Sequence, residues 1–266
     1  MKRAVLVGRE HPLVGAVGAV GEGEAAIALS RGGAPKRYAH THPNEDAAAF
    51  FRGPAGVLLA VADGHSGSEA AEIAVERLVD CGAEWTAGPP EALAGSWAER
   101  VRRALFEAGS AIARSRSASR TTLALAVLRP DADLLAYASI GDSHAFFVEV
   151  AEATDLAVSA REAPAFLGGR DETLESLGGK CVIGTRSLAG ARAVALVTDG
   201  LSERGIGVAA PSATVSQVAD RVADAGGDRR ALDVALGIVE AALAAHRRHG
   251  SGDNVAAAVA WLAGRH

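Results

Sequence analysis

Apolar positions along the chain follow two periods, which predict blocks of strands alternating with blocks of helices. Strand-like segments occupy residues 25–30, 47–52 and 57–62, and the last is apolar at every position, as in a strand buried on both faces. A helical pattern follows Asp63, and a longer one runs from Pro90 to Ser115 with apolar residues three and four apart. The first half of the chain is therefore predicted to be strands followed by two helices.

The second half repeats this organisation around a polar interruption. The pattern predicts, in order, strands at 121–128, 134–139 and 145–150, a strand at 193–198, helices at 212–225 and 229–246, and a strand at 255–262. The close succession of the first three strands favours antiparallel pairing. Residues 151–190 are polar, punctuated by glycine and weakly periodic, so we expect an insertion or flap near a site.

Strands and helices that arrive in blocks indicate an α+β fold, with packed antiparallel sheets and helices outside them, rather than a βαβ crossover fold. Residues 1–24 lack clear periodicity and are predicted to be an irregular lead-in or an edge strand. The remainder, 25–266, is predicted to be one domain with the flap at about 151–190, a length that a single domain accommodates.

Composition narrows the class of protein. The chain is 49% hydrophobic and 22% charged, with 27 basic and 32 acidic side chains and a net charge of -5, which argues against a disordered tail and against nucleic acid as the main partner. The longest apolar runs are shorter than the ~18–20 residues that span a bilayer, and Arg9 and Glu10 interrupt any signal-peptide core. We therefore expect no membrane partner and a cytoplasmic location. Cys81 and Cys181 are far apart, so no disulfide scaffold or zinc site is indicated.

Four aspartates stand at the ends of the strongly apolar strands. Asp46 and Asp253 come just before a strand, whereas Asp63 and Asp199 come just after one and are each followed by glycine. Carboxylates at strand ends can meet at one rim of a pair of sheets, where their mutual repulsion requires a positive charge between them. Oxygen ligands without cysteine select hard cations, so Mg²⁺ or Mn²⁺ is expected.

Six short segments carry a resemblance to a known family. In chain order they begin at Asn44 (NEDA), Val61 (VADGHSG), Arg120 (RTT), Ile140 (IGDS), Thr198 (TDGL) and Gly252 (GDNV). Together they resemble the ordered motifs of the metal-dependent protein phosphatases of the protein phosphatase 2C family, in its bacterial-type, single-domain form. The resemblance implies a four-layer αββα sandwich, two antiparallel sheets flanked by helix pairs, with a dinuclear Mn²⁺ or Mg²⁺ centre at one end. It also implies phosphoserine and phosphothreonine proteins as substrates and an opposing serine/threonine kinase.

The resemblance assigns roles residue by residue. Asp63 resembles the aspartate that bridges the metals, and Gly64 the glycine whose carbonyl is a ligand. Asp199 and Asp253 resemble the other direct ligands, and Asp142 resembles the residue that holds a third, weaker ion together with Asp199. The pair Glu45 and Asp46 resembles ligands that act directly or through water. Two ions can activate one water for in-line attack on phosphorus, so Asp63 and Asp199 are catalytic candidates.

His65 resembles the proposed general acid of the family, a role suited to a side chain with a reference pKa near ~6.5. The sequence departs from the family where an arginine usually binds the substrate phosphate, four residues before Glu45, because Thr41 stands there. The candidates to replace that arginine are Arg37 and His42, with Lys36 and His40 nearby. His144 follows Ser143 where arginine is usual.

Two other functions are compatible with parts of the sequence. The segment Gly64–Ser68 imitates the nucleophile elbow of α/β-hydrolases, in which Ser66 would attack an ester with Asp199 and His246 completing the triad. A phosphatase-like regulatory module that keeps the fold but turns over slowly or not at all is the second alternative.

Overall fold

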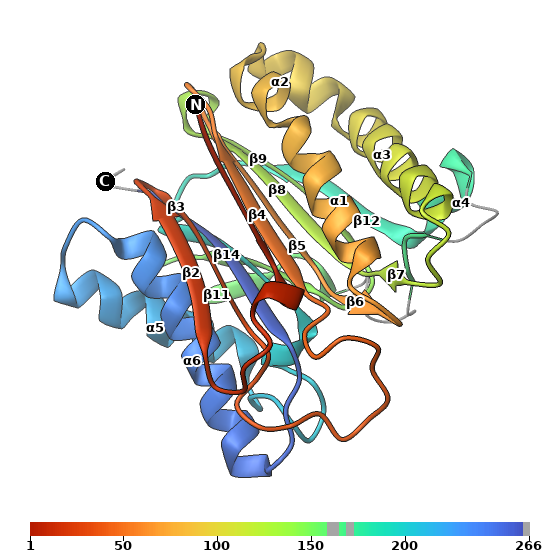
Figure 1. Cartoon of the computed structure of the whole chain (residues 1–266). Coiled ribbons are helices and arrows are strands. Elements are labelled where there is room, and N and C mark those ends of the chain that lie inside the picture. The colour runs from red at the N-terminus through yellow and green to blue at the C-terminus, as the bar shows by residue number, and fades with distance from the viewer. Residues whose placement is uncertain (159–164, 169–172, 263–266) are drawn as a thin grey trace.

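The computed structural model of the chain is a four-layer sandwich, in which two antiparallel sheets lie face to face and helices cover both outer faces (Figure 1). It describes residues 1–158, 165–168 and 173–262. This is the α+β, αββα architecture that the sequence predicts, and the order of layers places the ends of both sheets on a common edge.

The first sheet has the order β1-β4-β5-β8-β9-β12, with every neighbouring pair antiparallel. Its strands are β1 (Lys2–Val7), β4 (Ala47–Arg52), β5 (Val57–Ala62), β8 (Leu123–Arg129), β9 (Leu134–Ile140) and β12 (Cys181–Arg186).

The second sheet has the order β11-β10-β13-β14-β3-β2 and is also antiparallel throughout. Its strands are β2 (Val17–Glu22), β3 (Ala25–Ser30), β10 (His144–Val148), β11 (Ala153–Asp155), β13 (Ala193–Val197) and β14 (Val255–Trp261). Two short strands, β6 (Gly64–His65) and β7 (Arg120–Thr121), pair with each other beside the sheets.

Helices cover the outer face of each sheet. Those on the first sheet are α1 (Glu69–Asp80), α2 (Gly82–Ala87) and α3 (Pro90–Arg114), with α4 (Leu174–Lys180) against α3; those on the second are α5 (Pro211–Ala225) and α6 (Arg230–His249). Short 3₁₀ turns occupy η1 (Gly8–Glu10), η2 (Pro130–Ala132) and η4 (Asp199–Leu201). Proline begins both α3 and α5, where a missing backbone N–H has no cost because the first helical amides are unbonded.

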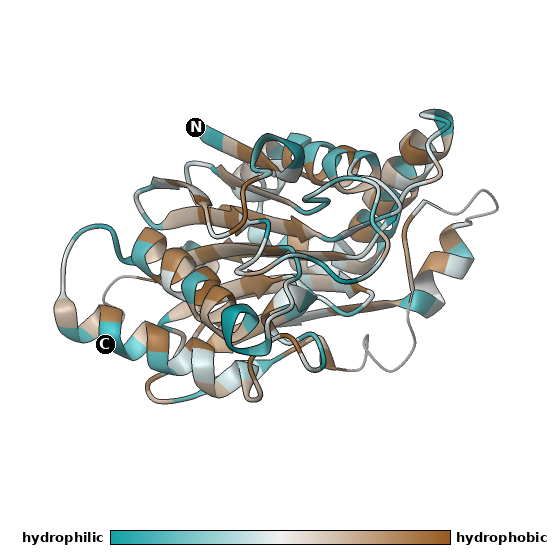
Figure 2. Cartoon of the chain, turned by 60° about the horizontal axis from the view of Figure 1, so that its bottom comes forward, coloured by the Kyte–Doolittle hydropathy of each residue, from teal (hydrophilic) through white to brown (hydrophobic). Residues whose placement is uncertain are grey.

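Alternation along each central strand divides the core into three layers. In β5, Leu58 and Ala60 pack against the helices, whereas Leu59 and Val61 pack between the sheets. Both sets are fully buried, which explains why this strand is apolar at every position. Figure 2 shows the same division as brown, hydrophobic strands in the middle and helices that alternate between brown and teal.

The sequence predicts either an irregular lead-in or an edge strand over residues 1–24; the first alternative is wrong for most of the segment, and the second is correct. The segment contains β1, which pairs with β4, and β2, which pairs with β3, so it supplies one edge strand to each sheet. An edge strand buries only part of its surface, and the two strands are largely exposed or half-buried. That partial exposure leaves no strict period-two pattern in the sequence.

Two predictions for the middle of the chain also need correction. The strand predicted at 145–150 is β10, which pairs with β13 in the second sheet and not with β9, because the turn at Gly141, with φ +89, carries the chain from one sheet to the other. The flap predicted at 151–190 is too long, because residues 181–186 form the edge strand β12. Residues 159–164 and 169–172 of that segment lie outside the described residues.

Candidate metal centre

Four strand ends meet at one end of the sandwich, and each brings an aspartate. Asp46 precedes β4 and Asp63 follows β5 in the first sheet, while Asp199 follows β13 and Asp253 lies just before β14 in the second. In an antiparallel pair, the start of one strand lies beside the end of its neighbour. The pairing of β4 with β5 brings Asp46 beside Asp63, and the pairing of β13 with β14 brings Asp199 beside Asp253. The two pairs meet on one rim, since the carboxylates of Asp63 and Asp199 belong to one cluster.

The carboxylates form two groups that share a member. One oxygen each from Asp63, Asp142 and Asp199 lies within 4.8 Å of the others, and the same holds for Asp199, Glu203 and Asp253. The groups open onto a cavity of about 310 Å³ lined by Lys36, Tyr38, Ala39, Glu45, Asp63, Gly64, His65, Ser66, Arg120, Asp199, Glu203 and Asp253. The sequence prediction did not include Glu203, which lies one turn beyond Asp199.

Burial and mutual repulsion make it unfavourable for all the carboxylates of this cluster to be ionised when no cation is bound. Burial, and then the charge of neighbouring aspartates, raises the pKa of Asp63 and of Asp199 well above the usual value. Burial raises the pKa of Asp46 to about 7, although its Oδ2 accepts a hydrogen bond from Thr198 Oγ1 at 2.7 Å. Among the described residues, Oδ1 of Asp46 and Oδ1 of Asp142 are buried with no hydrogen-bond partner. Orphaned carboxylate oxygens in an all-oxygen cluster fit a hard divalent cation.

Glu45 joins the cavity wall while also shaping the loop before it. Its Oε1 accepts backbone N–H groups of Thr41 at 3.0 Å and His42 at 3.1 Å. Its own backbone N–H donates to Asn254 Oδ1 at 2.8 Å, which ties the loop to the start of β14. Glu45 is therefore fixed between the two sheets at the edge of the carboxylate cluster.

Two further side chains contact Asp253. Lys36 Nζ lies 3.4 Å from Asp253 Oδ1, with only 2% of the lysine side chain exposed. The Tyr38 hydroxyl donates to the same oxygen, and burial, followed by the Asp253 charge, raises the pKa of Tyr38 well above its usual value. Sequence reasoning missed Tyr38, since no local pattern relates it to a residue at the other end of the chain.

His65 lies on the cavity wall beside the cluster. Its Nδ1 is 3.3 Å from Asp63 Oδ2, and the ring meets Phe166 edge-on with 4.6 Å between centroids. Burial is the largest cause that lowers the pKa of His65. The imidazole is thus placed where a proton could pass to a group bound in the cavity.

The glycines after Asp63 and Asp199 allow a neighbouring backbone to pack closely against them. A Cβ on Gly64 would lie 2.4 Å from the Glu45 carbonyl oxygen, and one on Gly200 would lie 1.7 Å from that of Asn254. Neither glycine has a positive φ, so the reason for glycine here is the approach of a neighbouring backbone rather than an unusual turn. Each contact packs the ends of two neighbouring strands of the same sheet together at the rim, β4 with β5 and β13 with β14.

The three residues predicted to bind the substrate phosphate are not among those that line the cavity. The Arg37 guanidinium lies beside Gly250 at the end of α6. Thr41 donates its N–H to Glu45, and His42 Nδ1 accepts the N–H of Ser68 at 3.1 Å. Their substrate-binding role stays a prediction, and their positions in the structure give it no direct support.

The esterase alternative requires His246 beside Ser66, which the structure does not provide. His246 Nδ1 accepts the Gly33 N–H at 3.2 Å, and Nε2 donates to the Gly200 carbonyl at 2.8 Å. Both ring nitrogens are therefore used by backbone groups, and burial lowers the pKa of this histidine. His246 joins α6 to the turn after Asp199 instead of serving a nucleophile.

His144 takes a structural position behind the cluster. Its Nδ1 lies 2.6 Å from Asp155 Oδ2, and its Nε2 lies 2.6 Å from Ser202 Oγ. Ser202 Oγ is in turn 3.4 Å from the Asp199 carbonyl oxygen. This chain of contacts supports the turn that carries Asp199.

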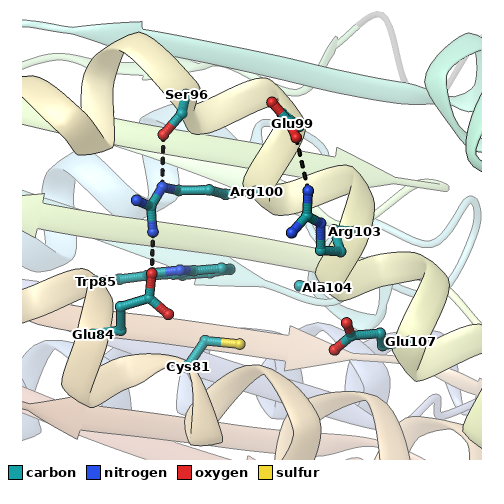
Figure 3. A pocket seen from close by; sticks show the side chains of 9 residues that line it. All are labelled: Cys81, Glu84, Trp85, Ser96, Glu99, Arg100, Arg103, Ala104 and Glu107. Atoms are coloured by element: carbon teal, nitrogen blue, oxygen red, sulfur yellow. Dashed lines mark hydrogen bonds and ion pairs between the residues drawn. The ribbon is translucent and has the colours of Figure 1, made fainter.

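A second hollow, of about 340 Å³, lies on the outside of the first sheet, between α3 and the α1–α2 corner (Figure 3). Four of its charged groups pair with one another, Arg100 with Glu84 and Arg103 with Glu99. Burial raises the pKa of the Cys81 thiol there to about 11, so it is protonated at neutral pH and a poor nucleophile. No residue of this hollow lines the acidic cavity.

Two facing antiparallel sheets with helices outside them and a carboxylate cluster at one end are the architecture that the resemblance to metal-dependent protein phosphatases implies. The chain belongs to the protein phosphatase 2C family, whose model, described as "Protein phosphatase 2C", matches residues 35–237.

Solved structures agree on the fold. The serine/threonine phosphatase PstP/Ppp of Mycobacterium tuberculosis is 23% identical, with 90% of this chain and 97% of that chain covered and a TM-score of 0.59. A PstP catalytic domain in complex with two manganese ions is 21% identical, covering 92% and 99%, with a TM-score of 0.60. Stp1 of Staphylococcus aureus is 16% identical, covering 92% and 96%, with a TM-score of 0.63.

No curated protein sequence matches the chain. Among the described residues, no helix has the length and apolar character needed to cross a bilayer.

Proposed function

We propose that this chain hydrolyses phosphoserine and phosphothreonine esters in proteins, with two Mn²⁺ or Mg²⁺ ions held at the acidic end of the sandwich. The observation that supports this most directly is Asp199, whose carboxylate belongs to both groups of converging oxygens. Two ligand groups that share a carboxylate can hold two ions close together, and here the shared residue is Asp199, whereas the family resemblance gives the bridging role to Asp63.

The residues present divide into ligands and supports. Asp63, Asp199 and Asp253 would hold the ions directly, with the Gly64 carbonyl beside them, and Asp142 would add a weaker third position with Asp199. Glu45 and Asp46 lie at the edge of the cluster and would act directly or through water. When bound, the ions supply a water of lowered pKa as nucleophile and neutralise charge on the phosphoryl group.

His65 is proposed to serve the leaving group. As the bond between phosphorus and the seryl or threonyl oxygen breaks, that oxygen must gain a proton, and His65 would donate it. Nδ1 of His65 is buried 3.3 Å from Asp63 Oδ2, so we take Nε2 as the nitrogen that donates the proton. The opposing serine/threonine kinase and the cytoplasmic location remain predictions from the sequence.

The test is hydrolysis of phenyl phosphate and of a phosphothreonine peptide after chelation, with and without added Mn²⁺. We expect activity only with the ion. Full activity in excess chelator would overturn the metal-dependent mechanism. A well-folded protein that binds Mn²⁺ but hydrolyses neither substrate would favour the regulatory-module alternative.

A further inference from the structure

Arg120 stands on the wall of the acidic cavity beside His65. It belongs to β7, where it is the direct antiparallel partner of His65 on β6. Both residues line the cavity, together with Asp63 and Asp199. Strands β6 and β7 are each two residues long and form a separate two-stranded sheet. The main structural effect of this pairing is to hold the two side chains side by side.

An aromatic ring fixes the guanidinium. Arg120 Cζ lies 4.0 Å from the centroid of Phe166, the same ring that meets His65 edge-on. The residue after Phe166 is pinned to β7 by two backbone hydrogen bonds, from Thr121 N–H to the Leu167 carbonyl at 3.0 Å and from Leu167 N–H to the Thr121 carbonyl at 2.8 Å. A guanidinium stacked on a ring keeps its N–H edges available for a planar, bidentate partner.

Arg120 forms no ion pair with the described carboxylates of the cavity wall. The other permanent cation on the wall, Lys36, is buried against Asp253. Arg120 has no ion pair with any described carboxylate, and it is an exposed residue of the cavity lining. Its charge is felt nearby, since it adds to the burial that lowers the pKa of His65. A preplaced guanidinium that has no ion pair among the described residues and lies next to a proton donor is suited to a phosphoryl oxygen.

We propose that Arg120, held on Phe166, binds the phosphoryl group of the substrate and replaces the arginine that is absent at Thr41. This inference rests on the proposed function and specifies how that site grips its substrate. It predicts that phosphate affinity depends on residue 120 and not on the segment from Arg37 to His42. Arg120 is thereby a substrate-binding residue, and Phe166 positions it.

The experiment measures phosphate binding separately from turnover. Calorimetric titration of inorganic phosphate, in the presence of Mg²⁺, is performed on the wild type, Arg120→Ala, Arg120→Lys and Phe166→Leu. The matched control is Arg114→Ala, which removes an exposed arginine six residues earlier and outside the cavity lining. Steady-state kinetics with phenyl phosphate and a phosphothreonine peptide follow on the same proteins.

We expect Arg120→Ala to weaken phosphate binding and to raise KM for both substrates about 10–100-fold, as loss of a charge-assisted bidentate contact does. Arg120→Lys should recover part of the loss, Phe166→Leu should show a smaller loss, and Arg114→Ala should stay within about twofold of the wild type. Unchanged phosphate affinity in Arg120→Ala would overturn the proposal. So would a KM increase confined to the peptide, which would place Arg120 against the polypeptide.

The two proposals fail in different ways. Phosphate binding that depends on Arg120 in a protein without turnover would retain the binding site and reject the phosphatase function. Turnover with an Arg120→Ala variant that matches the wild type would retain the phosphatase function and reject Arg120.

Discussion

The middle of the sandwich and its acidic end are built from the same strands, yet their chemistry is opposite. Between the sheets, β5 presents Leu59 and Val61 to the facing sheet, with no exposed surface. Only two residues beyond Val61, the same strand has ended in Asp63, a buried carboxylate whose pKa is raised by burial and by its neighbours. Within two residues, the chain thus changes from burying an apolar side chain, which stabilises the fold, to burying a carboxylate, which destabilises it.

The comparison shows how such a site can persist in a folded protein. Each buried leucine or valine stabilises the fold by roughly 1.5–3 kcal/mol, whereas each buried, unpaired carboxylate destabilises it. The rigid interior therefore holds the carboxylates in positions that they would leave if free to move. The proposed metal site therefore lies in the part of the structure that lowers the stability of the fold.

The sharpest way to break the acidic end is to remove its shared carboxylate. Asp199→Asn should lower kcat/KM at least 1,000-fold, because both ligand groups lose the same residue. The metal-free variant should melt at the wild-type temperature or above, since one repelling anion is gone. Kinetics and thermal denaturation in chelator check both expectations, and an active Asp199→Asn enzyme would contradict the proposed centre.

Breaking the middle should have the reverse outcome. Leu59→Ala removes a fully buried side chain between the sheets and should lower the free energy of unfolding by about 2–5 kcal/mol. Activity per folded molecule should change little, because the carboxylate positions are set by backbone pairing. Urea denaturation measures the loss, and Leu13→Ala, at a residue 70% exposed, is the control expected to stay within about 0.5 kcal/mol.

The cost of the acidic end should be visible as a pH dependence. The pKa of Asp46 is about 7 in the folded chain, above its ordinary value, so the folded state binds more protons than the unfolded state between about pH 4 and 7. Stability of the metal-free protein should therefore fall by roughly 2–4 kcal/mol as the pH rises through that window. Urea denaturation at pH 5 and pH 8 tests this. Asp46→Asn should reduce the difference, with Asp63 and Asp199 still contributing in the same direction, whereas Asp224→Asn, at an exposed position on α5, should leave it unchanged.

The smallest expected effect separates chemistry from architecture at the cavity wall. His65→Ala should lower the rate about 10–100-fold for phosphothreonine and only a few-fold for nitrophenyl phosphate, whose leaving group needs little protonation. Equal losses on both substrates would indicate that His65 is structural. The melting temperature serves as the control for folding.

The central part of this fold is predictable from sequence because its strands are buried on both faces. The bounds predicted at 25–30, 47–52 and 57–62 coincide with β3, β4 and β5. Strand β12 was missed, and the segment of β1 and β2 was predicted only as an irregular lead-in or an edge strand, because the exposed positions of an edge strand erase the alternation.

The site divides in the same way. Aspartates at strand ends could be predicted, since the turn and the strand are both local features. The contact between Tyr38 and Asp253 joins residues 215 positions apart, and the stacking of Arg120 on Phe166 depends on which segment lies beside β7. Such neighbours follow from tertiary packing, which a single sequence does not display.

The division of the aspartates between the sheets has a mechanical consequence. Asp46 and Asp63 belong to the first sheet, and Asp199 and Asp253 to the second, so a cation bound between them is a cross-link across the sandwich. A ligand present at 100 times its Kd that binds only the folded chain adds about 2.7 kcal/mol to stability. Separation of the two sheets then requires loss of the bound cation. The lifetime of the folded enzyme therefore depends on the supply of divalent ions.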